Sequence, residues 1–234
     1  MLVSTARSGT NYLLAVYQKC FPDEFVVKEI FRRDGDSFQQ LEKLLRINND
    51  EAIRMARYDA LGLWQKVKVA AARGNRRAAA KIFYYHQQSS DPIWSHFKSN
   101  DQVIHLIRRN PFDVLVSLKV ATLTNKWMDF GEKNSRPKDV GLSLDRSEVL
   151  SFIQEQHDYV EAKREFFRGA DYHEVFYEDV KDSENTLAAT LCAMRGVDAP
   201  SAPVKIGLKK QKVRSNAEIV LNYDAVADLD RQYF

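Results

Sequence analysis

The sequence predicts an α/β fold, in which a parallel β-sheet is flanked by helices in a single domain of residues 1–234. Short apolar runs of strand length alternate with segments of helical periodicity, a pattern typical of layered α/β domains. The first apolar run leads directly into a glycine-containing turn and an apolar helix, and no internal repeat is visible. A chain of 234 residues is long enough to bury one sizeable core.

Five short apolar runs are the expected strands. They are Met1–Thr5, Phe25–Ile30, Lys81–Tyr85, Val103–Ile107 and Tyr172–Tyr177. In a parallel sheet the carboxyl ends of these strands share one edge, which is where ligands of open α/β sheets bind.

Helical patterns separate or follow these runs. The expected helices are Thr10 to about Cys20, an interrupted segment over Glu42–Arg73, Pro111 to about Thr122, an amphipathic helix after Ser147 as its N-cap, one from Ser183-Glu184 that ends before Gly196, and a short one after the capping-box pattern Ser215-Asn216-Ala217-Glu218. Residues 125–146 are polar and without periodicity, so we expect a long, mobile surface loop there.

Composition excludes several classes of protein. The 35 Lys+Arg and 32 Asp+Glu residues give a net charge of +3, too little to indicate nucleic-acid binding. The longest stretch without a charged residue, Ser8–Gln18, has 11 residues, whereas a membrane span needs about 20. Cys20 and Cys192 are too few and too far apart for a disulfide framework or a metal knuckle. With no leader pattern at the start, we expect a soluble, cytoplasmic protein.

The first strand–turn–helix has the composition of an anion site. Gly9 allows a ligand to approach the backbone, and the helix N-terminus offers N–H groups and a partial positive charge. Against the Walker A pattern, Thr10 replaces the lysine and Asn11 replaces the magnesium-binding hydroxyl, while the basic residue is Arg7. The loop is therefore suited to phosphate or sulfate but poorly equipped for ATP hydrolysis. An ordinary strand–turn–helix corner is the alternative.

A second anion motif follows the fourth expected strand. Arg109 and Ser117 are eight residues apart, across the strand end and two turns of the next helix. An arginine and a hydroxyl so placed can converge on one phosphate. Each alone would more often be a surface salt bridge and a solvent-facing helix residue. Two such motifs in one sheet favour a ligand with two separated anionic groups.

These motifs together resemble the PAPS-dependent sulfotransferases, where PAPS is 3′-phosphoadenosine 5′-phosphosulfate. The Arg7-Ser8-Gly9-Thr10-Asn11 run resembles their 5′-phosphosulfate loop, and Arg109-Asn110-Pro111 with Ser117 resembles their 3′-phosphate motif. Tyr177-Glu178-Asp179-Val180 resembles a further recurrent segment. Because Arg7 stands where enzymes for small phenols and steroids more typically have lysine, the resemblance is closest to bacterial carbohydrate and glycolipid sulfotransferases. It implies a P-loop-NTPase-like parallel sheet with helices on its faces.

The resemblance also implies catalytic residues. Glu29, at the end of the second expected strand, is the candidate base for the acceptor hydroxyl, since the carbohydrate enzymes place a glutamate after this strand. The alternative is a glutamate paired with Lys28 or Arg32 at an exposed strand end. Lys81 resembles a family lysine near the sulfate and the acceptor, with a charged strand cap as the alternative. No metal is required for sulfuryl transfer.

Further residues are assigned to the donor and the acceptor. A late basic segment closes the 3′-phosphate pocket in the family, which implicates Lys209, Lys210 and Arg214, although a solvated face is the usual meaning of such a run. His86 and Trp127, the latter with the 125–146 loop as a lid, are the expected acceptor contacts. For His86 a structural role with a backbone partner is at least as well supported.

The expected activity is transfer of a sulfuryl group from PAPS to a hydroxyl of a carbohydrate or glycolipid, with 3′-phosphoadenosine 5′-phosphate (PAP) as product. A lipid acceptor would add peripheral membrane contact. The alternatives are a P-loop nucleotide kinase, which Thr10 and Asn11 disfavour, and a non-catalytic module that binds PAP or PAPS. The acceptor and the oligomeric state cannot be read from the sequence.

Overall fold

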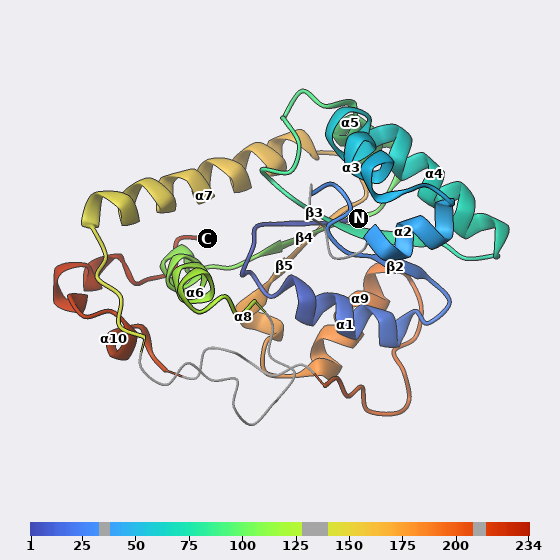
Figure 1. Cartoon of the computed structure of the whole chain (residues 1–234). Coiled ribbons are helices and arrows are strands. Elements are labelled where there is room, and N and C mark those ends of the chain that lie inside the picture. Colours follow the sequence, from blue (N-terminus) through green and yellow to red (C-terminus); the bar gives the residue numbers. More distant parts are fainter. Residues whose placement is uncertain (33–37, 128–139, 208–213) are drawn as a thin grey trace.

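The computed structural model describes residues 1–32, 38–127, 140–207 and 214–234. It confirms the predicted α/β architecture, because five parallel strands form one sheet with helices on both faces (Figure 1). The strands are β1 Leu2–Ser4, β2 Phe25–Val27, β3 Ala78–Phe83, β4 Val103–Ile107 and β5 Tyr172–Phe176. Their order across the sheet is β2-β3-β1-β4-β5.

The third strand begins earlier than expected. It starts at Ala78 and ends at Phe83, so Lys81 lies inside the strand, opposite Leu2 of β1, and does not open it. The residues before Lys81, Arg76-Arg77-Ala78-Ala79-Ala80, are strong helix formers, so the first half of the strand was not recognised from the sequence. Pairing with β1 and β2 on both sides overrides that local preference.

Two helices cover one face of the sheet, α1 Thr10–Cys20 and α9 Glu184–Met194. Leu13, Leu14 and Leu187 are fully buried between them and the strands. The thiol of Cys20 lies within hydrogen-bonding reach of Cys192 across these helices, although 171 residues separate the two cysteines in the sequence; burial, followed by this contact, raises the pKa of Cys20 to about 12. The two cysteines are free thiols in the structure.

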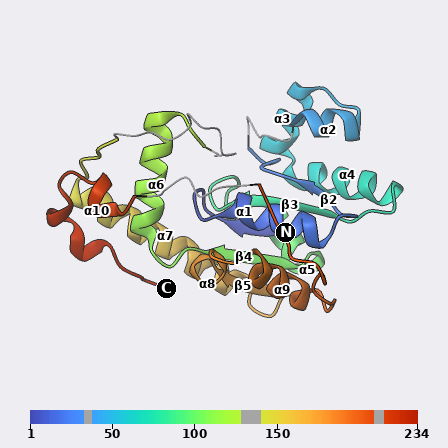
Figure 2. The ribbon, with the colours of Figure 1, turned by 90° about the horizontal axis from the view of Figure 1, so that it is seen from below.

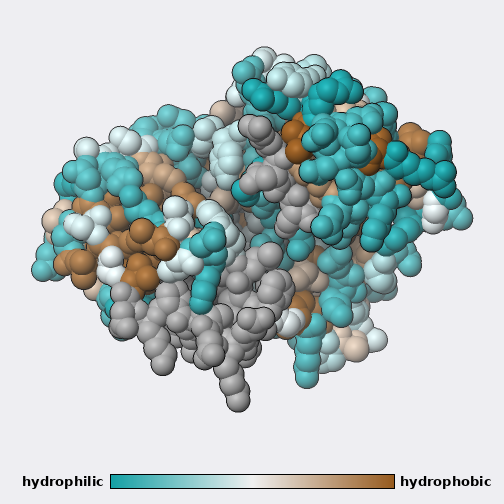
Figure 3. Space-filling model, in the orientation of Figure 1, coloured by the Kyte–Doolittle hydropathy of each residue, from teal (hydrophilic) through white to brown (hydrophobic). Residues whose placement is uncertain are grey.

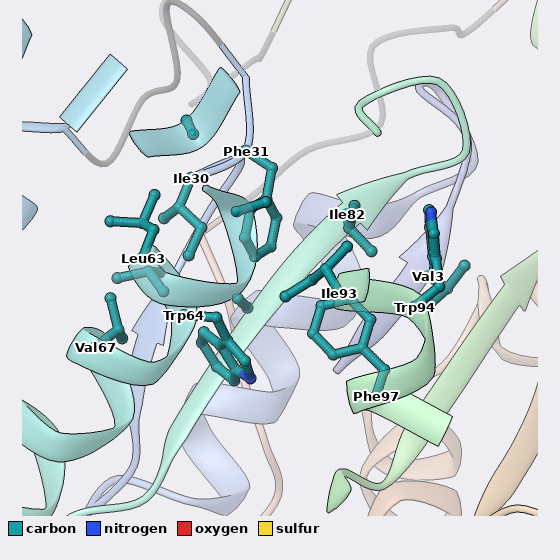
Figure 4. Close-up of a cluster of buried hydrophobic side chains, with 14 of the residues drawn as sticks. Val3, Ile30, Phe31, Leu63, Trp64, Val67, Ile82, Ile93, Trp94 and Phe97 are labelled. Atoms are coloured by element: carbon teal, nitrogen blue, oxygen red, sulfur yellow. The ribbon is translucent and has the colours of Figure 1, made fainter. Parts of the chain in front are cut away.

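Helices on the opposite face are α2 Phe38–Leu45, α3 Asn49–Tyr58, α4 Ala60–Arg73 and α5 Pro92–Asn100. The first three correspond to the interrupted helical segment, whereas α5 was not expected. Its start is nevertheless well specified, because the Asp91 side chain accepts a hydrogen bond from Ile93 N–H and Pro92 occupies the first turn. Trp64 and Phe97 pack edge to face, with ring centroids 6.4 Å apart, in the aromatic cluster under this layer (Figure 4).

A third apolar cluster lies between α6 Pro111–Thr124, the first half of α7 Arg146–Phe166 and α10 Asn216–Ile219. These elements stand at the end of the molecule opposite α2, α3 and α4 (Figure 2). Leu142 and Leu144 are buried in this cluster, so the end of the expected 125–146 loop is packed. Asp145 is the N-cap of α7, and the predicted cap Ser147 is wrong because it lies inside the helix.

On the face seen in Figure 3 the surface is largely hydrophilic, and exposed apolar side chains gather at the end where α10 lies. No helix in the described ranges is both long and apolar enough to cross a membrane.

Candidate functional site

The candidate site lies at the carboxyl edge of the sheet, after β1. β1 lies between β3 and β4. The chain first adds β2 and β3 on one side of β1 and then crosses to β4 and β5 on the other side, so the loop after β1 lies where the strand order reverses. Open α/β sheets bind ligands at this crevice. Because the strands are parallel, the segments that follow β2, β3, β4 and β5 begin at the same edge and bring the other candidate residues there.

The backbone of the loop after β1 adopts left-handed conformations at two positions. Arg7 and Gly9 have φ angles of 68° and 87°, in the left-handed region. A Cβ on Gly9 would lie 2.4 Å from Cδ2 of Tyr177, so the position needs glycine for conformation and for space. Successive turns of this kind direct N–H groups toward one point and form anion-binding concavities.

The first turn of α1 follows this loop directly. Gly9 stands at the N-cap and has no side chain to cap the helix, so its first N–H groups face the loop. Ser8 is 1% exposed, and its Oγ has no hydrogen-bond partner within the described part of the chain. A buried hydroxyl without a partner is costly unless a ligand supplies one. The start of α1 thus has no capping side chain, and it follows a buried hydroxyl that has no partner in the described residues.

Arg7 connects this loop with α6. Its Nε donates to Ser117 Oγ at 3.0 Å and its Nη1 donates to the backbone oxygen of Trp127 at 2.8 Å. Burial, followed by the nearby positive charge of Arg108, lowers the pKa of Arg7. Since two cations oppose each other here, a bound anion would be favoured by both. The structure thus brings Arg7, Ser117 and Trp127 together.

Arg108, which was not among the residues expected from the sequence, belongs to this cluster. Its Nη1 donates to the Arg7 carbonyl at 3.1 Å, and its guanidinium lies 5.1 Å from the ring centroid of Tyr177, which itself covers Gly9. Asp113 accepts from Nη2 at 2.9 Å. The Arg108-Arg109 doublet was the available signal, because neighbouring residues leaving a strand point to different sides.

Arg109 points away from Ser117. Its guanidinium pairs with both oxygens of Asp179, at 2.5 and 2.9 Å, and lies 4.0 Å from the ring centroid of Phe176 at the end of β5. Its backbone N–H donates to Glu178 at 3.0 Å. The structure therefore does not bring Arg109 and Ser117 into contact, and Arg7 is the arginine that meets Ser117.

Glu29 and Lys81 form a buried ion pair beside the loop. Lys81 is 1% exposed, and its Nζ lies 2.8 Å from Glu29 Oε1 and 2.7 Å from Asn11 Oδ1. It can reach α1 because it alternates in β3 with Ala80 and Ile82, which face the other helical layer. Lys81 thus joins the candidate base to the candidate anion loop.

Glu29 carries a second partner, since Arg32 Nη1 lies 3.1 Å from its Oε2. Burial raises the pKa of Glu29, but the charges and hydrogen bonds of Lys81 and Arg32 outweigh burial and hold it below its ordinary value. Glu29 therefore forms the ion pair with Arg32 that was the alternative to a catalytic role, and it also forms an ion pair with Lys81. A base in this position gains proton affinity only when these cations find other partners.

His86, which we expected to contact an acceptor, follows β3 together with Tyr85. His86 Nδ1 accepts a hydrogen bond from Phe83 N–H at 3.2 Å, which holds the ring against the end of β3. Tyr85, missed in the sequence, is 54% exposed, while burial of its hydroxyl and the charge of Glu29 raise its pKa to about 12. An exposed aromatic ring among buried neighbours was not visible from the residue pattern alone.

The late basic run is only partly described. Lys209 and Lys210 lie outside the described residues, as do positions 128–139 of the expected lid. Arg214 donates through Nη2 to the carbonyl of Glu218 in α10. The Ser215–Glu218 capping box is confirmed. In the described ranges, no group of three or more His, Cys, Asp or Glu residues is arranged to hold a metal ion.

Comparison with known proteins supports the fold. No protein-family model matches the chain, and no curated protein has a significant match. Among solved structures, the chain is similar to a sulfotransferase domain from the curacin biosynthetic pathway, with a TM-score of 0.53 and 13% identity over 86% of this chain and 74% of that one. It is also similar to a sulfotransferase from Alicyclobacillus acidocaldarius, with a TM-score of 0.53 and 14% identity over 97% of this chain and 90% of that one. The chain thus has a fold that both sulfotransferases share.

Proposed function

We propose that this protein is a sulfotransferase that moves a sulfuryl group from PAPS to a hydroxyl of a carbohydrate or glycolipid. The observation that carries the proposal is the chain Glu29–Lys81–Asn11, in which a carboxylate is joined through a buried ammonium to the anion loop after β1. The fold shared with two sulfotransferases supports it.

The loop residues have distinct roles toward the donor. N–H groups of the first turn of α1 and the Ser8 hydroxyl would hold the 5′-phosphosulfate, because the helix start has no capping side chain and the buried hydroxyl has no partner in the described residues. Arg7, beside Ser117, adds positive charge to the same place. Arg109, at the end of β4, is the residue proposed for the 3′-phosphate, with Lys209, Lys210 and Arg214 closing that side. Stabilisation of charge on the leaving phosphate is the largest contribution such groups make.

Glu29 is proposed as the base. The acceptor oxygen forms a bond to sulfur while the bond from sulfur to the 5′-phosphate oxygen breaks, and the hydroxyl proton passes to Glu29. Lys81 lies between Glu29 and Asn11, so it is positioned to contact the transferring group while remaining near the base. A positioned general base contributes about 10²–10⁴-fold. His86, Tyr85 and Trp127 border the acceptor side.

Transfer of labelled sulfate from PAPS to a panel of glycans, glycolipids and small hydroxyl compounds tests the proposal. Glu29→Gln should reduce transfer at least 100-fold and leave PAP affinity nearly unchanged. Near-normal turnover in that variant would remove Glu29 from the mechanism. PAP binding without transfer to any acceptor would instead favour the non-catalytic module, which the double pairing of Glu29 with Lys81 and Arg32 makes chemically plausible.

A further inference from the structure

We propose that Asp179 competes with the 3′-phosphate of the donor, because it occupies the Arg109 guanidinium until that phosphate replaces it. This inference rests on the proposed function, because it assigns the 3′-phosphate to Arg109. The ligand-free protein keeps its own carboxylate on Arg109. A nucleotide with a 3′-phosphate has to displace that carboxylate, so Asp179 lowers the affinity for such a nucleotide and leaves the affinity for 5′-AMP unchanged.

The geometry of the pair imitates a phosphate contact. Both terminal nitrogens of Arg109 pair with the two oxygens of Asp179, at 2.5 and 2.9 Å. Two parallel hydrogen bonds of this kind are the arrangement in which arginine binds phosphate as well as carboxylate. A phosphate that meets Arg109 in the same plane therefore competes with Asp179 for the same two nitrogens.

The arginine is held in place while its partner is free to leave. The Arg109 guanidinium lies 4.0 Å from the Phe176 ring centroid, and its backbone N–H and carbonyl are bonded to Glu178 and Tyr233 N–H. Asp179, in contrast, is 57% exposed on the four-residue helix α8 Tyr177–Val180. Displacement thus requires rotation of one solvent-exposed side chain and leaves Arg109 where it is.

Charge decides which ligands displace Asp179. An exposed carboxylate–arginine pair is weak, since water and salt solvate both groups. A phosphate monoester carries close to two negative charges near neutral pH, so it holds Arg109 more strongly than a carboxylate does. A nucleotide with a free 3′-hydroxyl offers no such group, and it leaves the Arg109–Asp179 pair intact.

The experiment compares PAP and 5′-AMP binding by calorimetry in the wild type, Asp179→Asn and Asp182→Asn. The control removes the same charge three residues away, where Asp182 is exposed and, in the described structure, forms no hydrogen bond or ion pair with Arg109. Because the competing pair is worth about 0.2–1 kcal/mol, Asp179→Asn should tighten PAP about 1.4- to fivefold and leave 5′-AMP within experimental error. Asp182→Asn should change neither.

The outcomes separate this inference from the proposed function. Wild-type preference for PAP over 5′-AMP, with a further gain for PAP alone in Asp179→Asn, supports both. The same wild-type preference with unchanged or weaker PAP binding in Asp179→Asn overturns the role of Asp179 and leaves the proposed function standing. Equal gains for both nucleotides would mean that Asp179 only repels anions in general, which also overturns it. Equal wild-type affinity for PAP and 5′-AMP refutes the 3′-phosphate assignment, and both ideas fall with it.

Discussion

Replacement of Gly9 by alanine tests how the loop after β1 is built. The new Cβ would lie 2.4 and 2.5 Å from Cδ2 and Cε2 of the Tyr177 ring, and the residue would keep a φ of 87°. The ring cannot shift freely, because the Arg108 guanidinium lies 5.1 Å from its centroid. Two costs therefore add, one from backbone conformation and one from overlap with Tyr177.

Their magnitudes can be separated with a matched glycine. Gly196, after α9, has a φ of 63° but nothing within 4 Å of its Cβ position. Left-handed backbone costs an L-residue about 1–2 kcal/mol, and alanine regains about 0.4–1 kcal/mol by restricting the unfolded chain. Gly196→Ala should therefore destabilise by roughly 0–1.6 kcal/mol. Gly9→Ala adds an overpacking cost of about 1–3 kcal/mol.

Thermal and urea unfolding of both variants measure the difference, which corresponds to roughly 2–12 °C in melting temperature for a domain of this size. Adding Tyr177→Ala should remove most of the excess cost of Gly9→Ala, and a double-mutant cycle gives that coupling directly. If Gly9→Ala is no less stable than Gly196→Ala, the Tyr177 ring does not constrain the loop and the reasoning fails.

Three further predictions concern charge and burial elsewhere in the protein. The pKa of Glu29 is below its ordinary 4.5 in the folded protein, so its ion pairs stabilise the fold above about pH 4.5, and this stabilisation is lost as the pH falls through the lower folded pKa. Glu29→Gln should reduce the loss of stability at acid pH, measured by urea unfolding. An unchanged loss of stability at acid pH would contradict the pairing. Burial lowers the pKa of Lys163, over the Trp94 ring, to about 8 from 10.5. Stability should therefore rise between about pH 8 and 10.5, and Lys163→Met should abolish that rise; a wild-type curve that stays flat there refutes the burial argument. Tyr84→Phe removes the hydroxyl that lies 2.6 Å from the fully buried His105 Nε2 and should cost about 1–3 kcal/mol, whereas a loss below about 0.5 kcal/mol would show that water replaces the bond.

The sequence predicts the local features of this fold well, because each depends on neighbouring residues. Gly9 after β1, the Pro111 start of α6 and the Ser215–Glu218 capping box are specified within a few positions. Where two local signals compete, the prediction is less secure. Asp145 and Ser147 are both good caps, and burial of Leu144 just before the helix favours the earlier start.

Pairings between distant segments could not be predicted in the same way. Glu29 and Lys81 were assigned to one site by resemblance, but their 2.8 Å contact depends on β3 passing between β2 and β1. Arg109 and Ser117 share a motif, yet the strand exit sends Arg109 toward β5 and leaves Arg7 to meet Ser117. Which of two adjacent arginines faces a loop depends on strand register, which the residue types alone do not fix.

Lys81 links the two parts of the candidate site, the anion loop after β1 and the candidate base Glu29. Its buried ammonium is stabilised by Glu29 on one side and by Asn11 of the anion loop on the other. An anionic group in the loop would compete with Glu29 for the Lys81 ammonium. As the interaction between Lys81 and Glu29 weakens, burial raises the pKa of the Glu29 carboxyl. Arg32 stays paired with the other oxygen of Glu29 and limits this rise. If Glu29 is the base, as proposed, donor binding would thereby favour proton transfer from the acceptor, and Lys81 is the side chain that links the two sites.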